Sequence, residues 1–249
     1  MMSLRAILTY HSLDDSGSPI SVRPSAFEGH VRWLATSQVR VLPLEELWAE
    51  VHSGVDSHGD AVAITFDDGF ANFAEQAAPL LHDLGLPSTV FVVSRRVGKT
   101  NAWRDRDEPG IPTLPLLDWD ALGRLGESGV TVGGHTRTHR ALDQLGTAEI
   151  IDEIIGGRDD ISARLGLTPR SFAYPYGALA DAASECVSRA YKLGVTTELR
   201  PLGRKDAASR LPRLDAYYLR GANDLRSWGS ARFRWYLRLR AAIRSVRSA

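Results

Sequence analysis

The feature that most constrains the fold is an alternation of short apolar runs with longer amphipathic segments of helical period. The short runs are rich in Val, Ile and Thr, as expected of parallel strands buried on both faces. They lie at residues 6–10, 39–42, 61–66, 89–93, 130–133, 171–173, 193–197 and 211–214. The amphipathic segments predict helices at 24–37, 71–84, 118–127, 147–165 and 179–191. This order predicts an α/β fold with a parallel sheet, either a barrel or a doubly wound sheet.

Composition is that of a folded chain with little cysteine. Of the 249 residues, 43% are hydrophobic and 24% are charged, which excludes wholesale disorder and allows one domain or two. Cys186 is the only cysteine, so an internal disulfide and a cysteine-rich zinc site are excluded. We find no secretory signal pattern and no run of about 18 apolar residues, and we therefore expect a cytoplasmic protein.

Two adjacent carboxylates, Asp67 and Asp68, follow the apolar run 61–66 in the motif TFDDG. Carboxylates at the end of a buried strand are costly unless a cation, either Arg, Lys or a metal ion, compensates them. Taken alone, the motif is equally compatible with an Asp-Asp-Gly turn in which Asp68 caps the next helix.

Two histidines, His135 and His139, follow the run 130–133 in the motif HTRTH. Histidines four residues apart share one face of a helical turn, and this spacing lets both rings reach one metal ion. For so short a motif, two surface histidines that open a helix are the simpler interpretation.

Two further segments end predicted strands. In FAYPYG, residues 172–177, a rigid turn presents the backbone N–H of Tyr176, which either stabilises an oxyanion or belongs to a plain aromatic turn. His11 follows the run 6–10, where a lone histidine is usually structural. Because the working groups of both candidate folds sit at the C-terminal ends of strands, the four clusters should meet. Together they match a His₂Asp metal site with a spare carboxylate and a spare imidazole, as in a metal-assisted amide or ester hydrolase.

The order TFDDG, HTRTH, YPYG resembles the polysaccharide deacetylase family, also called carbohydrate esterase family four, over roughly residues 6–214. The resemblance implies a distorted, incomplete (β/α) barrel of about seven parallel strands, TIM-like in architecture. It also implies hydrolysis of N-acetyl groups on amino sugars. By matching position it implies Asp67 as general base, the backbone N–H of Tyr176 at the oxyanion, and Zn²⁺, or Co²⁺ or Ni²⁺, held by Asp68, His135 and His139. The substrate-binding residues it implies are Phe70, Trp119, Tyr174 and Pro175.

The sequence departs from the family pattern at two positions. Most members carry an arginine two residues before the proline of the third motif, where this chain has Ala173. Most also use a late histidine as general acid, but no histidine follows His139, and residues 211–214 read LPRL. The opening Tyr-His-Ser resembles the branch of biofilm poly-N-acetylglucosamine deacetylases, which implies that His11 replaces the missing acid. Arg213 is a candidate for orienting Asp67.

Positive charge is concentrated near the C-terminus. The net formal charge is zero, yet residues 200–249 contain 13 Lys or Arg and only 3 Asp or Glu. Residues 232–247 include six arginines and predict a helix with an apolar stripe of Trp235, Leu239, Ala242 and Val246. We expect a catalytic domain at 1–222 and a basic helix at 223–249 that packs on it through this stripe. The alternative is a helix that lies on an anionic membrane surface.

The leading hypothesis is a metal-dependent hydrolase that removes N-acetyl groups from an amino sugar in a saccharide, polysaccharide or lipid-linked glycan. One alternative is a related amide hydrolase that opens a cyclic imide or ureide. Another is a catalytically silent carbohydrate-binding protein of the same fold. The expected partner is an N-acetylated saccharide. The alternative placement of the basic helix adds peripheral contact at the inner membrane surface. Nucleic acid is not expected, because no recognised binding motif accompanies the charge.

Overall fold

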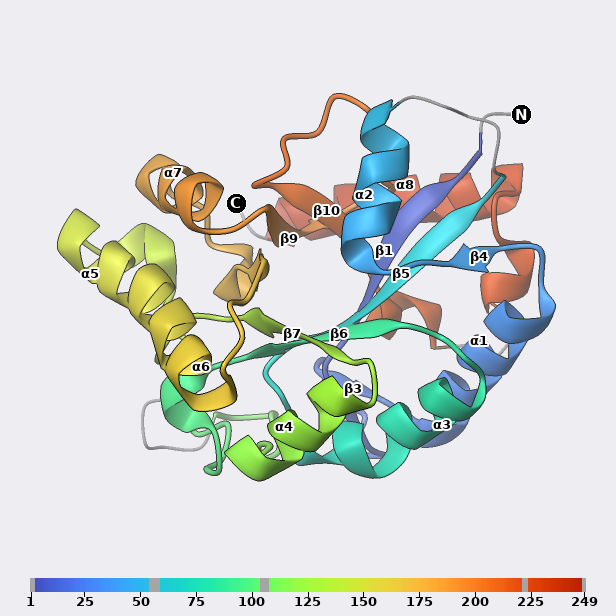
Figure 1. The fold of residues 1–249 in the computed structure, drawn as a ribbon. Helices are drawn as coiled ribbons and strands as arrows, with labels where there is room; N and C mark the ends of the chain where they lie inside the picture. The colour runs from blue at the N-terminus through green and yellow to red at the C-terminus, as the bar shows by residue number, and fades with distance from the viewer. Residues whose placement is uncertain (1–2, 54–58, 104–107, 221–223, 248–249) are drawn as a thin grey trace.

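A ring of parallel strands forms the centre of the computed structural model, which describes residues 3–53, 59–103, 108–220 and 224–247. The ring runs through β1 (Arg5–Tyr10), β5 (Ala61–Phe66), β6 (Ser88–Val92), β7 (Thr131–Gly134), β8 (Ser171–Ala173), β9 (Leu193–Leu199) and β10 (Leu211–Asp215), and β10 pairs again with β1 (Figure 1). β4 (Arg40–Val41) adds to β5 outside the ring, and β2 (Ser12–Leu13) pairs with β3 (Ser21–Val22). The predicted barrel is confirmed, and it closes with one strand fewer than the eight of a TIM barrel.

Helices cover the outside of the ring and connect its strands (Figure 1). They are α1 (Pro24–Thr36), α3 (Ala78–Asp83), α4 (Trp119–Glu127), α5 (Thr147–Ile151), α6 (Gly157–Leu165), α7 (Asp181–Ala190) and α8 (Ala231–Arg247). A π-helical turn, Phe73–Ala77, precedes α3, and a second, Asp152–Gly156, joins α5 to α6. The predicted helices are therefore confirmed within a few residues, and the one expected at 147–165 is continuous but contains the π-helical turn.

Side chains of each ring strand alternate between the barrel interior and the surrounding helices. On β1, Leu8 and Tyr10 point outward into the core beneath the helices, whereas Ile7 points inward. Ile7 packs inside the barrel with Ala63 and Phe91. Both faces of the strands are thus apolar, which explains why the sequence shows no polar alternation.

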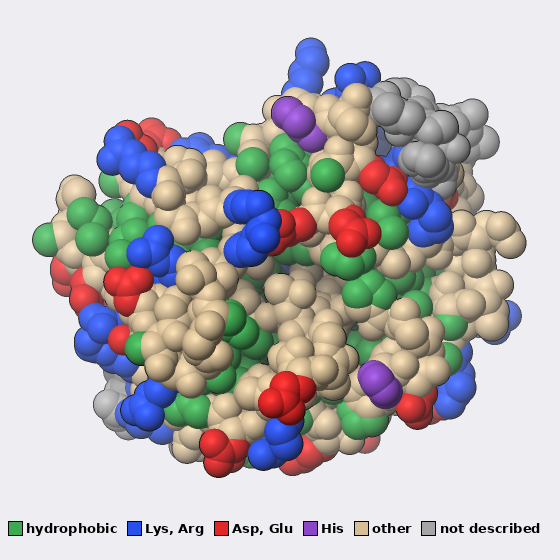
Figure 2. All heavy atoms as spheres, in the orientation of Figure 1, with side chains coloured by type: hydrophobic (Ala, Val, Ile, Leu, Met, Phe, Trp, Pro, Cys, Tyr) green, Lys and Arg blue, Asp and Glu red, His purple; other side chains and the backbone are tan. Residues whose placement is uncertain are grey.

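One end of the barrel is closed by α2 (Leu44–Ser53), a helix that the sequence patterns did not predict. Leu44 and Leu47 of α2 are buried against inward-facing Ile7, Ala61 and Ala63, near the N-terminal ends of β1 and β5. Figure 1 looks at this end, with α2 crossing in front of the ring. On the same face in Figure 2, acidic and basic side chains are interspersed. The opposite end, at the strand C-termini, holds the polar side chains described below.

α8 packs against the barrel wall, but not through the predicted stripe. Phe233 and Leu237 are buried in the outer core, whereas Trp235 and Leu239 are 64% and 42% exposed. Ala242 is exposed too, and the side chain of Val246 lies outside the described part of the chain. The prediction was wrong because the helix has a second apolar row at i, i+4 spacing on its other side, and helical period alone does not say which row is buried.

Candidate active site

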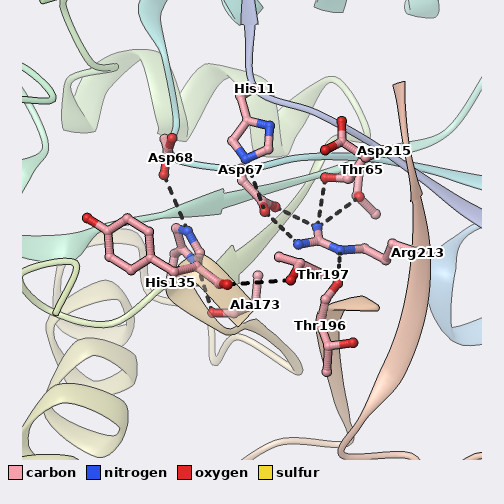
Figure 3. Close-up of polar contacts among 12 residues, drawn as sticks. His11, Thr65, Asp67, Asp68, His135, Ala173, Thr196, Thr197, Arg213 and Asp215 are labelled. Atoms are coloured by element: carbon pink, nitrogen blue, oxygen red, sulfur yellow. Dashed lines mark hydrogen bonds and ion pairs between the residues drawn. The ribbon is translucent and has the colours of Figure 1, made fainter. Parts of the chain in front are cut away.

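A cavity of about 330 Å³ lies at the C-terminal end of the barrel. Residues predicted from the sequence line it at the ends of four ring strands, and Thr197 of β9 and Asp215 of β10 line it as well. The predicted residues are His11 after β1, Asp67 and Asp68 after β5, His135 and His139 after β7, and Tyr174 and Tyr176 after β8. The predicted clusters, far apart in the chain, therefore meet at one place (Figure 3). Residues 104–107, in the loop between Trp103 and Pro115, lie outside the described residues.

Asp67 is held by Arg213, which is fully buried inside the barrel. The two guanidinium Nη atoms donate to both carboxylate oxygens over 2.7 and 2.6 Å, a bidentate pair (Figure 3). Arg213 also donates to the hydroxyl of Thr9 at 2.9 Å and to the carbonyl of Thr196 at 2.8 Å. Burial raises the pKa of Asp67, but the charge and hydrogen bonds of Arg213 outweigh it, so that the pKa is below its ordinary value. Asp67 is thus an ionised carboxylate in a fixed orientation.

Asp68 faces two imidazole rings. Its Oδ1 lies 3.3 Å from Nε2 of His135 and 3.2 Å from Nε2 of His139, and all three side chains are buried. Nδ1 of His135 donates to the carbonyl of Ala173 at 2.7 Å, which turns Nε2 toward the carboxylate. One ligand atom from each of the three residues lies within 4.8 Å of the others. The sequence prediction that these residues come together is confirmed.

The donor set fits a divalent cation such as Zn²⁺. Two imidazole nitrogens and one carboxylate oxygen are ordinary zinc ligands, and a hydrogen bond to the remote ring nitrogen, as His135 makes to Ala173, is typical of them. Among the described residues, no donor meets Asp68 Oδ1 with the geometry of a regular hydrogen bond, although this atom is buried. A buried carboxylate oxygen in that position calls for positive charge.

The pKa values of the three residues are shifted by burial and by the charges of their neighbours. Burial raises the pKa of Asp68, but the charge of His139 and the close approach of both imidazole rings hold it well below the ordinary value. Burial lowers the pKa of His135, yet the close Asp68 carboxylate and the charge of Asp67 raise it overall. Burial dominates at His139 and lowers its pKa. Asp68 is thus ionised, and His139 favours the neutral form that binds metals.

The HTRTH segment is a loop rather than the helical turn that we inferred from its i, i+4 spacing. The backbones of Thr136 and His139 are left-handed, with φ of 65° and 63°. Two such turns, instead of one helical face, bring the two rings to within 5.0 Å of each other, centroid to centroid. Spacing alone could not show this, because a helix and a compact loop both place residues i and i+4 close together.

A buried carboxylate, Glu153, braces this loop from the π-helical turn. It accepts hydrogen bonds from the backbone N–H of Arg137 at 3.0 Å and of Thr138 at 2.9 Å, and a third from the Thr138 hydroxyl. Gly157, one turn on, lies so close that a Cβ there would be 3.1 Å from the Thr136 carbonyl carbon. Gly156 and Gly157 therefore permit close contact between this helix and the histidine loop.

Backbone strain is concentrated at the cavity. Only four non-glycine residues of the described ranges have positive φ, and these are Asp68, Thr136, His139 and Tyr176. Each such conformation costs on the order of 1–3 kcal/mol and persists only where the surroundings enforce it. Three of them, Asp68, His139 and Tyr176, are positions that sequence matching assigned to the site, and Thr136 lies within the HTRTH motif.

His11 and Tyr176 lie on either side of the carboxylates. Nε2 of His11 is 3.8 Å from Oδ2 of Asp67, and the ring is partly exposed to the cavity. The hydroxyl of Tyr176 is 3.1 Å from Nδ1 of His139, and its left-handed backbone orients the N–H of the same residue. At Ala173, where most family members have arginine, the methyl group packs inside the barrel, and the guanidinium comes instead from Arg213 on β10.

The structure brings only part of the predicted substrate wall to the cavity. Tyr174 lines it, and Pro175 is the buried residue between Tyr174 and Tyr176. Phe70 is buried and bridges to Leu116, and Trp119 lies in a groove between α4 and α6, so these two assignments are corrected.

Trp103 is a wall residue that the sequence did not single out. Its indole stacks on the ring of His139, with centroids 4.1 Å apart and planes inclined by 28°. It lines the site cavity together with Ile111 and Glu108, from the same polar, proline-marked loop.

Fold and site together define a barrel hydrolase with a buried carboxylate–imidazole centre at the strand C-termini. The family model for polysaccharide deacetylases matches residues 54–197. The chain therefore belongs to the polysaccharide deacetylase family, hydrolases of the carbon–nitrogen bond of N-acetyl groups.

Individual relatives agree with this assignment. The poly-β-1,6-N-acetyl-D-glucosamine N-deacetylase of Staphylococcus epidermidis is 23% identical over 204 residues, which cover 78% of this chain and 67% of the relative. The deacetylase PplD of Streptococcus pyogenes superposes with a TM-score of 0.74 at 21% identity, over 86% of this chain and 93% of that one. IcaB of Ammonifex degensii superposes with a TM-score of 0.71 at 21% identity, over 88% of this chain and 96% of that one. At these identities the solved structures establish the fold.

Proposed function

We propose that this protein is a metal-dependent N-deacetylase that releases acetate from an N-acetylated amino sugar within a saccharide chain. The observation that carries the proposal is the convergence of Asp68, His135 and His139 beside a second, separately held carboxylate, Asp67. A divalent cation held by these three residues, most simply Zn²⁺, would polarise the acyl oxygen and make water more acidic.

The residues of the chain supply the proton transfers. Asp67, ionised and oriented by Arg213, accepts a proton from the attacking water. As the amide C–N bond breaks, His11 donates a proton to the departing nitrogen, so that acetate and a free amine result. The backbone N–H of Tyr176 hydrogen-bonds the oxyanion of the tetrahedral intermediate. His11 and Asp67 are close enough, at 3.8 Å, to serve one substrate amide from neighbouring positions.

The surroundings of the cavity support a substrate longer than one sugar. On one side, Trp103 and His139 also line a second cavity of about 370 Å³. On the other side, Thr197 and Arg244 also line a third, of about 450 Å³. A saccharide chain that passes through all three would place its middle sugar at Asp67. A small cyclic imide or ureide would occupy the central cavity alone, and the N-deacetylase activity of the staphylococcal relative on poly-β-1,6-N-acetyl-D-glucosamine also favours a saccharide.

Acetate release from a panel of substrates tests the proposal. Oligomers of N-acetylglucosamine, lipid-linked N-acetylated sugars and small cyclic amides are compared at equal concentration, with zinc-loaded and chelator-treated protein. We expect acetate from the saccharides only, increasing from monomer to trimer, and none after chelation. If the zinc-loaded protein releases no acetate from any saccharide, the result would support the catalytically silent carbohydrate-binding protein. Ring opening of a small cyclic amide would support the imide or ureide hydrolase.

His11→Ala separates the proposed acid from the rest of the site. We expect the rate to fall by about 10²–10⁴-fold, the usual contribution of a general acid, while the protein keeps its metal. His52→Ala, a change of the same size at a histidine on α2 at the closed end, is the matched control and should leave the rate unchanged. A full rate in His11→Ala would remove this residue from the mechanism.

A further inference from the structure

We propose that the outer face of α8 docks on a membrane surface that carries anionic headgroups. The outer face consists of Trp235, Leu239 and Ile243 with the flanking Arg232 and Arg238. The three apolar side chains follow one another at intervals of four residues and so form one row. They are 64%, 42% and 39% exposed, although each is a large hydrophobic residue.

The fold does not use this row. The opposite side of α8 fixes the helix to the barrel, because Phe233 and Leu237 are each only 2% exposed. Tyr236 donates its hydroxyl to the carbonyl of Tyr218 at 2.6 Å, and Arg240 donates to the Tyr236 hydroxyl at 3.1 Å. With one side fully engaged, the apolar row on the other must have a different partner or remain in water. In the described ranges, the other exposed large hydrophobic residues are only Ile151, Tyr176 and Leu179.

The positive charge around this apolar row favours a partner with an anionic surface. Residues 225–249 contain seven arginines and no aspartate or glutamate. This differs from the closed end of the barrel, where acidic and basic side chains are interspersed (Figure 2). An apolar row with tryptophan, flanked by arginines, is the pattern of a helix that lies in the interface of a bilayer with anionic lipids. Among the described residues, no helix is both long and apolar enough to cross the bilayer, so the contact would be at the surface.

A second copy of the chain fits this face less well. In a symmetric contact between two α8 helices, Arg232 and Arg238 of one copy would meet the same residues of the other, and like charges would be brought together. The face offers no carboxylate to pair with them. An anionic bilayer supplies the opposite charge along with an apolar layer for Trp235.

The position of α8 suggests what membrane contact would do for catalysis. This part of the inference rests on the function proposed above. The C-terminal half of the helix reaches the mouth of the active site, where Arg244 lines both the site cavity and the adjoining cavity of about 450 Å³. Ala241 lines the adjoining cavity as well. A bilayer against the outer face would therefore lie beside the entrance. The substrate class that fits is an N-acetylated glycan held close to a membrane, such as one joined to a lipid.

Vesicle co-sedimentation tests the docking directly. The full chain is mixed with vesicles of phosphatidylcholine alone or with 30% phosphatidylglycerol added. We expect binding to the anionic vesicles only, weakened by high salt. Trp235→Ser/Leu239→Ser should reduce the partition coefficient by roughly tenfold or more, and Arg232→Gln/Arg238→Gln by about fivefold for each arginine. All variants should keep the wild-type rate on a soluble oligosaccharide.

Matched controls separate the face from general surface chemistry. Arg32→Gln/Arg189→Gln removes the same charge from exposed arginines of α1 and α7, and Ile151→Ser removes an exposed apolar residue elsewhere. Both should bind vesicles like the wild type. Binding is also measured after chelation and should not change, so failure of the proposed catalysis would not affect this result. Equal binding to both vesicle types, no binding at all, or unchanged binding by the α8 variants would overturn the proposal. The proposal would also be overturned if the protein did not bind vesicles and instead formed a dimer, or a complex with a DNA oligonucleotide, that depends on Trp235.

Discussion

The two ends of the barrel interior are built by the same strands, but one is apolar and the other is charged. Along the inward row of β5, Ala61 and Ala63 lie in the apolar core beneath α2, Thr65 follows, and Asp67 reaches the active-site cavity. On β10, Leu211 belongs to the same apolar core and Arg213, two residues on, binds Asp67. Within two or three side chains, each strand passes from apolar packing to ionised groups.

This difference divides the work between the two ends. The closed end gains stability from burial of apolar surface, and its residues need no unusual backbone geometry. The open end contains all four strained non-glycine residues of the described chain together with the buried carboxylates. The apolar half of the ring holds the strand ends in place, and the strained loops can then present their side chains to a common centre. Substitutions at the open end should therefore affect chemistry, and those at the closed end only stability.

Among the predictions that compare the two ends, the largest effect on activity is expected from Asp67→Asn, which keeps the shape of the side chain and removes its charge. We expect the rate of acetate release to fall by about 10²–10⁴-fold, because the proposed general base is lost, with metal content unchanged. Steady-state kinetics and metal analysis of the same preparation measure both. A variant that retains the wild-type rate would show that another group accepts the proton.

Arg213→Met tests the ion pair inside the barrel. It leaves the Asp67 carboxylate buried without its partner, and we expect a loss of about 3–5 kcal/mol in the free energy of unfolding. The double variant Asp67→Asn/Arg213→Met should recover most of this loss, since neither charge remains. Chemical denaturation of the three variants decides. Equal destabilisation of the single and double variants would mean that Arg213 acts through packing alone.

Leu47→Ala is the counterpart at the closed end. Leu47 is fully buried beneath the barrel, and its truncation should cost about 2–5 kcal/mol of unfolding free energy. Below its unfolding temperature, the variant should hydrolyse substrate at the wild-type rate. A fall in rate as large as that expected of Asp67→Asn would contradict the division between the two ends.

Much of this division could be predicted from the sequence. The runs of Val, Ile and Thr located the ring strands, because strands buried on both faces are apolar throughout. Asp67, Asp68, His135, His139 and His11 were predicted at strand ends, and the structure brings them to one cavity. The short helix α2 was missed, and its role as the closing element depends on contacts with distant strands.

Other features depend on three-dimensional context that patterns do not contain. The loop geometry of HTRTH requires residues with a left-handed backbone conformation, and nothing in the sequence indicates that Thr136 adopts one. Trp103 stacks on His139 although the two are far apart in sequence and in different loops. Phe70 and Trp119 were assigned to the wall as aromatic residues near the motifs, but their side chains point elsewhere. On α8, two apolar rows competed, and only the packed structure shows which one is buried.

A smaller effect is expected from Glu153→Gln, which sharpens the account of the histidine loop. The amide can no longer accept three hydrogen bonds, so the loop should hold its histidines less firmly. We expect metal affinity to fall by about 10–100-fold, as for other groups that orient ligands from behind. Competition with a chelator measures this, and Glu149→Gln, an exposed residue of the same helix that pairs with Arg140, is the matched control. Equal affinity in both variants would show that the brace is dispensable.

The smallest effect concerns Asp160, whose pKa is lowered by hydrogen bonds from Arg137 and Ser94 and by the charge of Arg137, despite partial burial. Because the folded-state pKa is below that of the unfolded chain, the pair stabilises the protein above about pH 4. The contribution disappears as the pH falls through the lowered folded-state value. Asp160→Asn should therefore lower the free energy of unfolding by about 0.5–1 kcal/mol at pH 7, and by progressively less on acidification. Denaturation curves at several pH values measure it, and a pH-independent difference would contradict the ionic origin.

The central claim is that Asp68, His135 and His139 hold one divalent cation at the open end of the barrel. Metal analysis after dialysis against a buffer with trace zinc tests it most directly, with wild type, Asp68→Ala and Asp160→Asn side by side. We predict one zinc ion per chain in the wild type and in Asp160→Asn, and none in Asp68→Ala. A wild-type protein without metal, or an Asp68→Ala variant that holds zinc as tightly as the wild type, would contradict the account.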